Sequence, residues 1–132
     1  MSRRVLVLVR HAKAVAAAAT DEQRPLADRG HRDAAAAGRW LAEIGIEPDL
    51  AVVSSATRAR ETWTDIAEAL AGHEVQVDGR IYDNTVGVLL EVIGEVSDDI
   101  TTLVLVGHNP SMHGLAVTLS DGDGEPAVEA AI

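Results

Sequence analysis

The sequence feature that most constrains the fold is an apolar run at 5–9 that is followed directly by Arg10 and His11. The run reads Val-Leu-Val-Leu-Val, so it is short, rich in β-branched residues and continuous, without polar alternation. This pattern is typical of a buried strand in a parallel sheet. Open α/β sheets bind ligands at the carboxyl ends of such strands. At that position Arg10 can hold an oxyanion, and His11 can attack it or move its proton.

Two later segments repeat this arrangement of a strand, a short turn and a basic or titratable residue. The expected strand at 50–54 precedes Arg58, and the expected strand at 101–106 precedes His108. Because parallel strands end at one edge of the sheet, we expect these side chains to converge with Arg10 and His11. Two imidazoles and at least two guanidiniums suit a phosphoryl group, whose dianion needs several fixed donors.

The rest of the chain alternates strands with amphipathic helices. We expect strands at 4–9, 50–54, 74–77 and 101–106, and helices at 28–44, 56–71, 85–96 and 110–120. This alternation predicts an α/β fold, a three-layer α/β/α sandwich with a mostly parallel sheet. Asp28 is expected to cap the first helix and Gly45 to end it. The length favours one domain over 1–132, with a poorly ordered tail at 121–132 that is rich in glycine and acidic residues.

Composition excludes several classes of protein. The 132 residues carry 11 basic and 21 acidic side chains, and a net charge of −10 argues against a nucleic-acid-binding surface. The absence of cysteine excludes disulfides, thiolate chemistry and cysteine-based zinc sites. We find neither a bilayer-spanning segment nor the apolar stretch of a signal peptide, and therefore expect a cytoplasmic protein without a membrane partner.

Four motifs in this order resemble those of the histidine phosphatase superfamily, which is also called phosphoglycerate-mutase-like. They are Val-Arg-His-Ala-Lys (9–13), Asp-Glu-Gln-Arg-Pro-Leu-Ala-Asp-Arg-Gly (21–30), Ser-Ser-Ala-Thr-Arg-Ala-Arg-Glu-Thr (54–62) and Val-Gly-His-Asn-Pro-Ser (106–111). The second motif and the short length are similar to those of the small SixA-type phosphohistidine phosphatases. The resemblance implies a phosphoglycerate-mutase-like fold.

The resemblance also implies a role for each site residue. His11 would be the nucleophile that forms a transient phosphohistidine, and Arg10 and Arg58 would clamp the phosphoryl oxygens. His108 would donate to the same oxygens, and Arg24 would supply a third guanidinium. No metal or cofactor is implied, because the arginines supply the positive charge. In-line attack needs a neutral His11 whose other ring nitrogen keeps its proton, for which a backbone carbonyl is the expected partner. His108 would work best as a cation, with a pKa raised by the phosphate.

The class of substrate depends on whether the leaving group needs a proton from the protein. A phosphate ester expels a poor alkoxide and benefits from a general acid, for which Asp83 is the candidate carboxyl. A phosphohistidine can take its proton from solution and leave as neutral imidazole. The sequence therefore favours a phosphorylated protein as substrate, with inorganic phosphate as product. Two alternatives stay open, namely a phosphomonoesterase of small molecules with Asp83 as acid, and a phosphate-binding module without catalysis.

The C-terminal part of the chain departs from the pattern of this family. Members of this family usually continue past the last helix into further strands, whereas only residues 121–132 remain here. Two interpretations follow, a pared-down domain that lacks C-terminal strands or a sequence that continues beyond Ile132. Either one concerns stability and assembly more than chemistry, because the motif residues all precede this tail.

Overall fold

The computed structural model describes residues 4–71, 74–120 and 127–130. Every helix and strand expected from the sequence is present, with ends that differ by at most four residues. The elements, in chain order, are β1 (Val5–Arg10), η1 (Asp21–Gln23), α1 (Asp28–Glu43), β2 (Leu50–Ser54), α2 (Thr57–Ala67), β3 (Glu74–Asp78), η2 (Gly79–Ile81), α3 (Val86–Gly94), β4 (Thr102–Gly107), α4 (Ser111–Ser120) and β5 (Ala127–Ala130).

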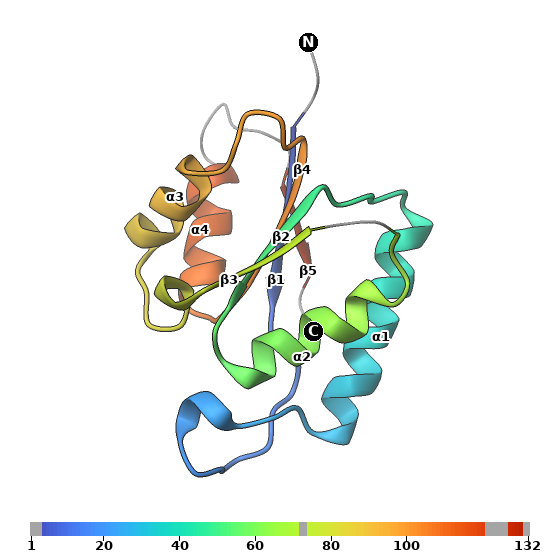
Figure 1. The fold of residues 1–132 in the computed structure, drawn as a ribbon, viewed down its shortest axis with the longest axis vertical. Coiled ribbons are helices and arrows are strands. Elements are labelled where there is room, and N and C mark those ends of the chain that lie inside the picture. Colours follow the sequence, from blue (N-terminus) through green and yellow to red (C-terminus); the bar gives the residue numbers. More distant parts are fainter. Residues whose placement is uncertain (1–3, 72–73, 121–126, 131–132) are drawn as a thin grey trace.

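The strands form one parallel sheet in the order β3-β2-β4-β1-β5 (Figure 1). β4 therefore lies between β1 and β2, although it is the latest of the three in the sequence. β1 pairs with β4 from Val5 opposite Thr102 to Arg10 opposite Gly107. Because all of these strands run in one direction, the turns that follow β1, β2 and β4 meet at the same edge of the sheet.

Helices cover both faces of the sheet, as expected for a three-layer sandwich. α1 and α2 lie on one side, and α3 and α4 lie on the other (Figure 1). Alternate residues of β1 supply the two cores: Val7 and Val9 pack under α1 and α2, whereas Leu6 and Leu8 pack under α3 and α4. A strand that is buried on both faces needs apolar residues at every position, which accounts for the continuous run.

Part of the tail at 121–132, which the sequence predicts to be poorly ordered, is assigned to a strand. Ala127–Ala130 form β5, which pairs in parallel with β1 over Leu6 to Val9. This pairing supplies hydrogen-bond partners on the side of β1 that faces away from β4, where unpaired backbone groups would otherwise form a sheet edge. Residues 121–126 and 131–132 lie outside the described part of the chain.

The ends of α1 show one corrected and one confirmed prediction. Ala27, not Asp28, is the N-cap residue, and it makes no side-chain capping bond. Asp28 is instead the first helical residue, where a carboxylate still interacts favourably with the positive end of the helix dipole. Gly45 follows the helix with a φ of 84°, a left-handed conformation that glycine adopts without steric cost, as expected for a helix stop.

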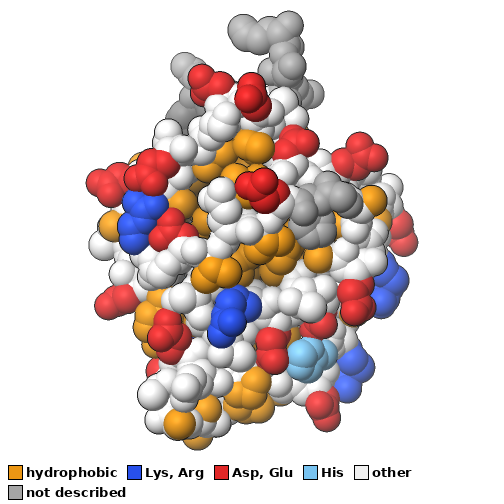
Figure 2. Space-filling view, in the orientation of Figure 1, with side chains coloured by type: hydrophobic (Ala, Val, Ile, Leu, Met, Phe, Trp, Pro, Cys, Tyr) orange, Lys and Arg blue, Asp and Glu red, His pale blue; other side chains and the backbone are white. Residues whose placement is uncertain are grey.

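The edge strand β3 leaves apolar surface uncovered. Val75 and Val77 are 46% and 55% exposed. Figure 2 shows apolar side chains gathered near the middle of the face that β3 crosses, with acidic side chains distributed around them. Within the described ranges, no helix combines the length and apolarity needed to cross a membrane.

Gly38 allows α1 to pack closely on α2. A Cβ atom at this position would overlap the backbone of Ile66 in α2, which has no flexible end that could move aside. We expect Gly38→Ala to lower the free energy of unfolding by about 1–3 kcal/mol, the cost typical of overpacking. Urea denaturation measures the effect. Gly94→Ala is the control, because its Cβ would meet open space at the end of α3, and this variant should match or slightly exceed the parent. Equal stability of the two variants would contradict this account of the packing.

Candidate active site

The pairing of β1 with β4 brings His11 and His108 together. The ladder extends one step past the strands, where the backbone N–H of His11 donates to the carbonyl of Gly107 at 3.0 Å. The two imidazole rings then lie with their centroids 5.1 Å apart, inclined at 57°. The structure thus brings together the two histidines that the sequence places 97 residues apart.

The orientation of His11 suits a nucleophile. Its Nδ1 lies 2.8 Å from the backbone carbonyl of Ala12, and a carbonyl only accepts, so Nδ1 carries the proton. Nε2 is then the nitrogen with a free lone pair. Burial lowers the pKa of His11, and the neighbouring guanidiniums of Arg58, Arg10 and Arg24 lower it further, against an opposing effect of the Ala12 carbonyl. The ring is therefore neutral near pH 7, with the backbone-held tautomer that the sequence analysis requires.

His108 is also neutral in the structure. Burial is the main cause that lowers its pKa to about 4, and His11 and Arg58 add to the effect. Its Nε2 lies 2.8 Å from the Oγ of Ser54, the last residue of β2, and its Nδ1 is buried without a partner among the described residues. From the sequence we expect a cationic His108 beside phosphate. A phosphoryl dianion in this crevice would have to supply most of that upward shift, since burial and the neighbouring basic groups oppose it and Asp21 favours it only in part.

Arg58 is a buried guanidinium at the start of α2. It is 6% exposed, and its helix begins directly after the turn that follows β2. Thr62, one turn later, donates to the carbonyl of Arg58 at 2.7 Å and accepts from the backbone N–H of Ala12 at 3.0 Å. This hydroxyl ties the Arg58 turn to the residue after His11. Thr62 belongs to the third motif, although the sequence alone does not reveal this contact.

Asp21 gathers three side chains around one carboxylate at the edge of the site. Arg58 donates to its Oδ2 from 3.2 Å and to its backbone carbonyl from 2.8 Å. Arg24 donates to Oδ1 from 3.0 Å, and the hydroxyl of Tyr82 donates to Oδ2 from 2.6 Å. The Tyr82 hydrogen bond, with the two guanidiniums, lowers the pKa of Asp21 to about 2. This carboxyl is therefore ionised at any physiological pH.

Tyr82, not Asp83, is the side chain of its segment that approaches the histidines. The Tyr82 ring meets that of His108 edge-on with centroids 5.9 Å apart, and the Arg58 guanidinium lies 5.9 Å from its centre. Asp83 is exposed on the turn before α3, and no contact in the described part of the chain joins it to His11, His108 or Arg58. The sequence pattern located the segment but gave no signal for Tyr82, the only tyrosine in the chain.

An open groove runs from His11 along the segment after β1 toward the start of α1. Four basic side chains lie along this groove with one carboxylate, that of Asp33, and the full lining is Arg10, His11, Ala12, Lys13, Ala14, Arg24, Arg29, Asp33 and Asn109. This local excess of positive charge contrasts with the net charge of −10. Among the described residues, no three His, Cys, Asp or Glu side chains lie close enough to hold a metal ion.

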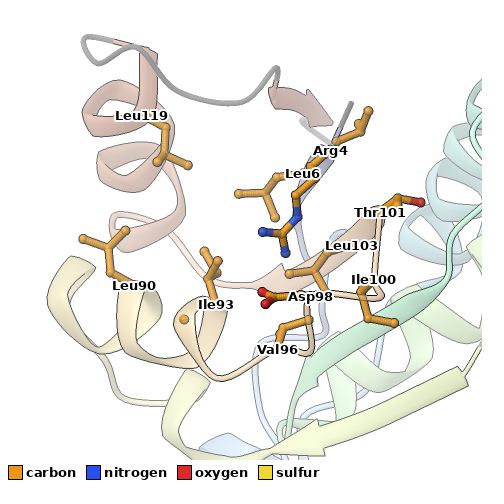
Figure 3. A pocket seen from close by; sticks show the side chains of 12 residues that line it. Arg4, Leu6, Leu90, Ile93, Val96, Asp98, Ile100, Thr101, Leu103 and Leu119 are labelled. Atoms are coloured by element: carbon orange, nitrogen blue, oxygen red, sulfur yellow. The ribbon is translucent and has the colours of Figure 1, made fainter. Parts of the chain in front are cut away.

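A second cavity lies at the opposite end of the sheet, under α3 and α4 (Figure 3). Its walls are mainly aliphatic, with Leu6, Leu90, Ile93 and Leu119 around it. The described lining of this cavity includes Arg4 and Asp98 but neither of the two histidines. The groove beside His11 is therefore the candidate active site.

Comparisons with known proteins agree with this fold. The family model of the histidine phosphatase superfamily (branch 1) matches residues 6–117. The chain belongs to this superfamily, as its motifs suggested.

Individual relatives indicate which members of the superfamily this chain resembles. An uncharacterised protein of Mycobacterium tuberculosis is 38% identical over 123 residues, which cover 92% of this chain and 76% of the relative. The solved structure of a candidate phosphohistidine phosphatase SixA from Nakamurella multipartitia is 32% identical, with a TM-score of 0.80 over 92% of this chain and 71% of that one. A second SixA candidate, from Agrobacterium tumefaciens, is 30% identical with a TM-score of 0.82, and the match covers 86% and 75% of the two chains. The chain is thus similar to SixA-type proteins over most of its length.

The lowered pKa of His108 makes stability depend on pH in a defined direction. Between pH values of about 4, the pKa in the folded protein, and 6.5, the ordinary pKa of histidine, the unfolded chain binds a proton at this ring that the folded protein does not. Acidification from pH 7 to 5 should therefore decrease the free energy of unfolding. We expect His108→Gln to make this decrease smaller, although His11, whose pKa is also lowered, keeps part of it. Urea titrations of both proteins at pH 7, 6 and 5 measure the slopes, and identical slopes would contradict the burial of a neutral His108.

Proposed function

We propose that this protein is a phosphatase that works through a covalent phosphohistidine on His11, and that its substrate is a protein phosphorylated on histidine. The observation that carries the proposal is the geometry of His11, a neutral imidazole held by a backbone carbonyl among guanidiniums. Family membership and the similarity to SixA candidates support the same reaction class.

The reaction takes place in two displacements. Nε2 of His11 attacks phosphorus, its bond to phosphorus forms, and the bond from phosphorus to the leaving group breaks. Water then attacks the phosphorus atom, the bond to Nε2 breaks, and inorganic phosphate and His11 are released. Arg10, Arg58 and Arg24 stabilise the negative charge of the phosphoryl oxygens in both steps. His108 takes up a proton as the dianion enters and donates to one of these oxygens.

The carboxyl groups near the site support a substrate that needs no protein acid. Asp21 lies beside Arg58 but is held ionised, so it has no proton to give to an alkoxide. Asp83 is exposed and makes no described contact with the site. A phosphorylated imidazole differs from an ester, because its distal nitrogen can be protonated by solvent and the ring then leaves as a neutral molecule. The acid-dependent alternative, a phosphomonoesterase with Asp83 as acid, has less support.

The shape and charge of the groove agree with a macromolecular substrate. Its lining comes mostly from the single segment after β1 and from the start of α1, so the groove is open along one side. A phosphorylated side chain on a protein surface can reach His11 by this path. A small phosphate ester would leave much of the groove unfilled.

Substitution of His11 tests the mechanism. His11→Ala should abolish turnover, because no other group can form the covalent intermediate, and Arg58→Ala should reduce kcat by about 10²–10³-fold, the loss typical for one charged transition-state donor. Single-turnover experiments quenched in denaturant at alkaline pH, where the P–N bond persists, should reveal a phosphoenzyme in the parent protein and none in His11→Ala.

His113→Ala serves as the control, since this histidine is exposed on α4, and it should retain parental rates. Parental rates in His11→Ala would refute the nucleophile. Phosphate binding by the parent without turnover or a phosphoenzyme would favour the alternative of a non-catalytic binding module.

A comparison of substrates tests the leaving-group argument. We expect kcat/KM for a phosphohistidine-bearing domain to exceed that for a panel of alkyl phosphate esters by at least about 10²-fold. This is the usual contribution of a general acid, which ester hydrolysis needs and this site does not supply. Release of inorganic phosphate measures both. Faster ester turnover, lost in Asp83→Asn, would instead establish the phosphomonoesterase.

A further inference from the structure

Asp21 binds the end of the Arg58 guanidinium that a phosphoryl group of the substrate would need. Both terminal nitrogens of Arg58 donate to Asp21, Nη1 to its backbone carbonyl and Nη2 to its carboxylate. The third nitrogen, Nε, is buried and has no partner in the described part of the chain. A phosphoryl oxygen that binds Arg58 therefore meets a guanidinium whose charge is already partly neutralised.

The segment that carries Asp21 is fixed firmly at its base and weakly at its tip. At the base, Ala14 and Leu26 form an antiparallel bridge, and Val15 donates to the carbonyl of Pro25 at 2.9 Å. At the tip, η1 has no buried residue. The contacts that hold the tip to the rest of the protein are polar, and besides those of Asp21 they include a 2.6 Å hydrogen bond from Ser55 to Glu22. A tip that buries no side chain of its own and is held through hydrogen bonds opens at low cost in free energy.

Electrostatics favour an exchange of anions at this point. The side chain of Asp21 is 56% exposed, whereas that of Arg58 is 7% exposed. When a phosphoryl dianion approaches Arg58, it repels the Asp21 carboxylate and competes for the same donor. The carboxylate can move into water without loss of solvation, but the buried guanidinium cannot follow it. The arrangement of lowest energy is then one in which the Asp21 carboxylate is solvated by water and Arg58 donates its hydrogen bonds to the phosphoryl oxygens.

We propose that Asp21 is a built-in competitor that occupies Arg58 until the phosphoryl group displaces it. This inference rests on the proposed function, because it takes Arg58 as a phosphoryl clamp. The internal anion keeps Arg58 oriented between turnovers and weakens the binding of the phosphate product, which favours its release. Asp21 thereby acts as a positioning and specificity-determining residue, since it penalises ligands whose charge is too small to displace it.

The experiment compares anion binding in variants that differ by one carboxylate. Asp21→Asn keeps the shape and the backbone contact of Asp21 while removing its charge, and Asp21→Ser is a second variant with the same purpose. Calorimetric titration with tungstate, a tetrahedral dianion, measures binding without turnover. We expect Kd to fall about tenfold in both variants, as when one charge-assisted hydrogen bond no longer has to be broken. The melting temperature should stay equal or fall slightly, because the variants lose an ion pair, so affinity and stability change in opposite directions.

Glu22→Gln is the matched control. Glu22 is the adjacent carboxylate, and its described partner is Ser55, not a guanidinium. This variant removes the same unit of charge from the same helical turn, and its Kd for tungstate should remain within about twofold of the parental value, as expected for a screened surface charge.

The outcomes separate the two proposals. A parental protein that binds tungstate, with Asp21 variants that bind it equally or more weakly, would overturn the competitor and leave the phosphatase mechanism intact. An equal gain in Glu22→Gln would also overturn it, by showing a general effect of net charge. Failure of the parent and all variants to bind tungstate would overturn both.

Discussion

The alignment of β1 with β4 is the constraint on which the site depends. Parallel pairing from Val5–Thr102 to Arg10–Gly107 continues into the bond from His11 to Gly107, so both histidines leave the sheet at the same level. A shift of one residue in this register would turn alternate side chains to the other face of the sheet. The two cores prevent such a shift, because Val7 is buried on one face of the sheet and Leu8 on the other. Packing far from the chemistry thus determines how close the two imidazoles lie.

The sequence predicted the fold and the central part of the site for the same reason. Continuous apolar runs identify doubly buried strands, and strands alternating with amphipathic helices restrict the topology to a parallel sheet with two helical layers. Once the sheet is parallel, the convergence of His11, Arg58 and His108 follows from the position of each residue after its strand. Strand order was not needed for this inference, because every order places the same ends at one edge.

Loop side chains were harder to predict, since no periodicity governs them. The sequence offers Asp83 as the candidate acid, but the residues around it do not reveal that Tyr82 lies against His108 while Asp83 is exposed. Asp21 belongs to the second motif, but the sequence gives no sign of its contacts with Arg58 and Tyr82, which lie 37 and 61 positions away. The same is true of the tail, where β5 forms only because the outer side of β1 offers backbone partners. The depressed pKa of His108 likewise depends on burial that a sequence does not specify.

The strand order has a consequence for how such a protein can diversify. β4 lies between β1 and β2, so His108 has His11 on one side and Ser54 on the other. Ser54 ends β2, and His11 and His108 directly follow β1 and β4, so all three lie at the ends of the innermost strands. The Asp21–Tyr82 contact and most of the groove beyond His11 come instead from the segments that follow β1 and β3, at 12–33 and 79–85. Insertions in those segments would reshape what the protein recognises while the reacting groups keep their spacing. Selection can therefore alter recognition largely without moving the groups proposed for the chemistry, of which only Arg24 lies in these segments.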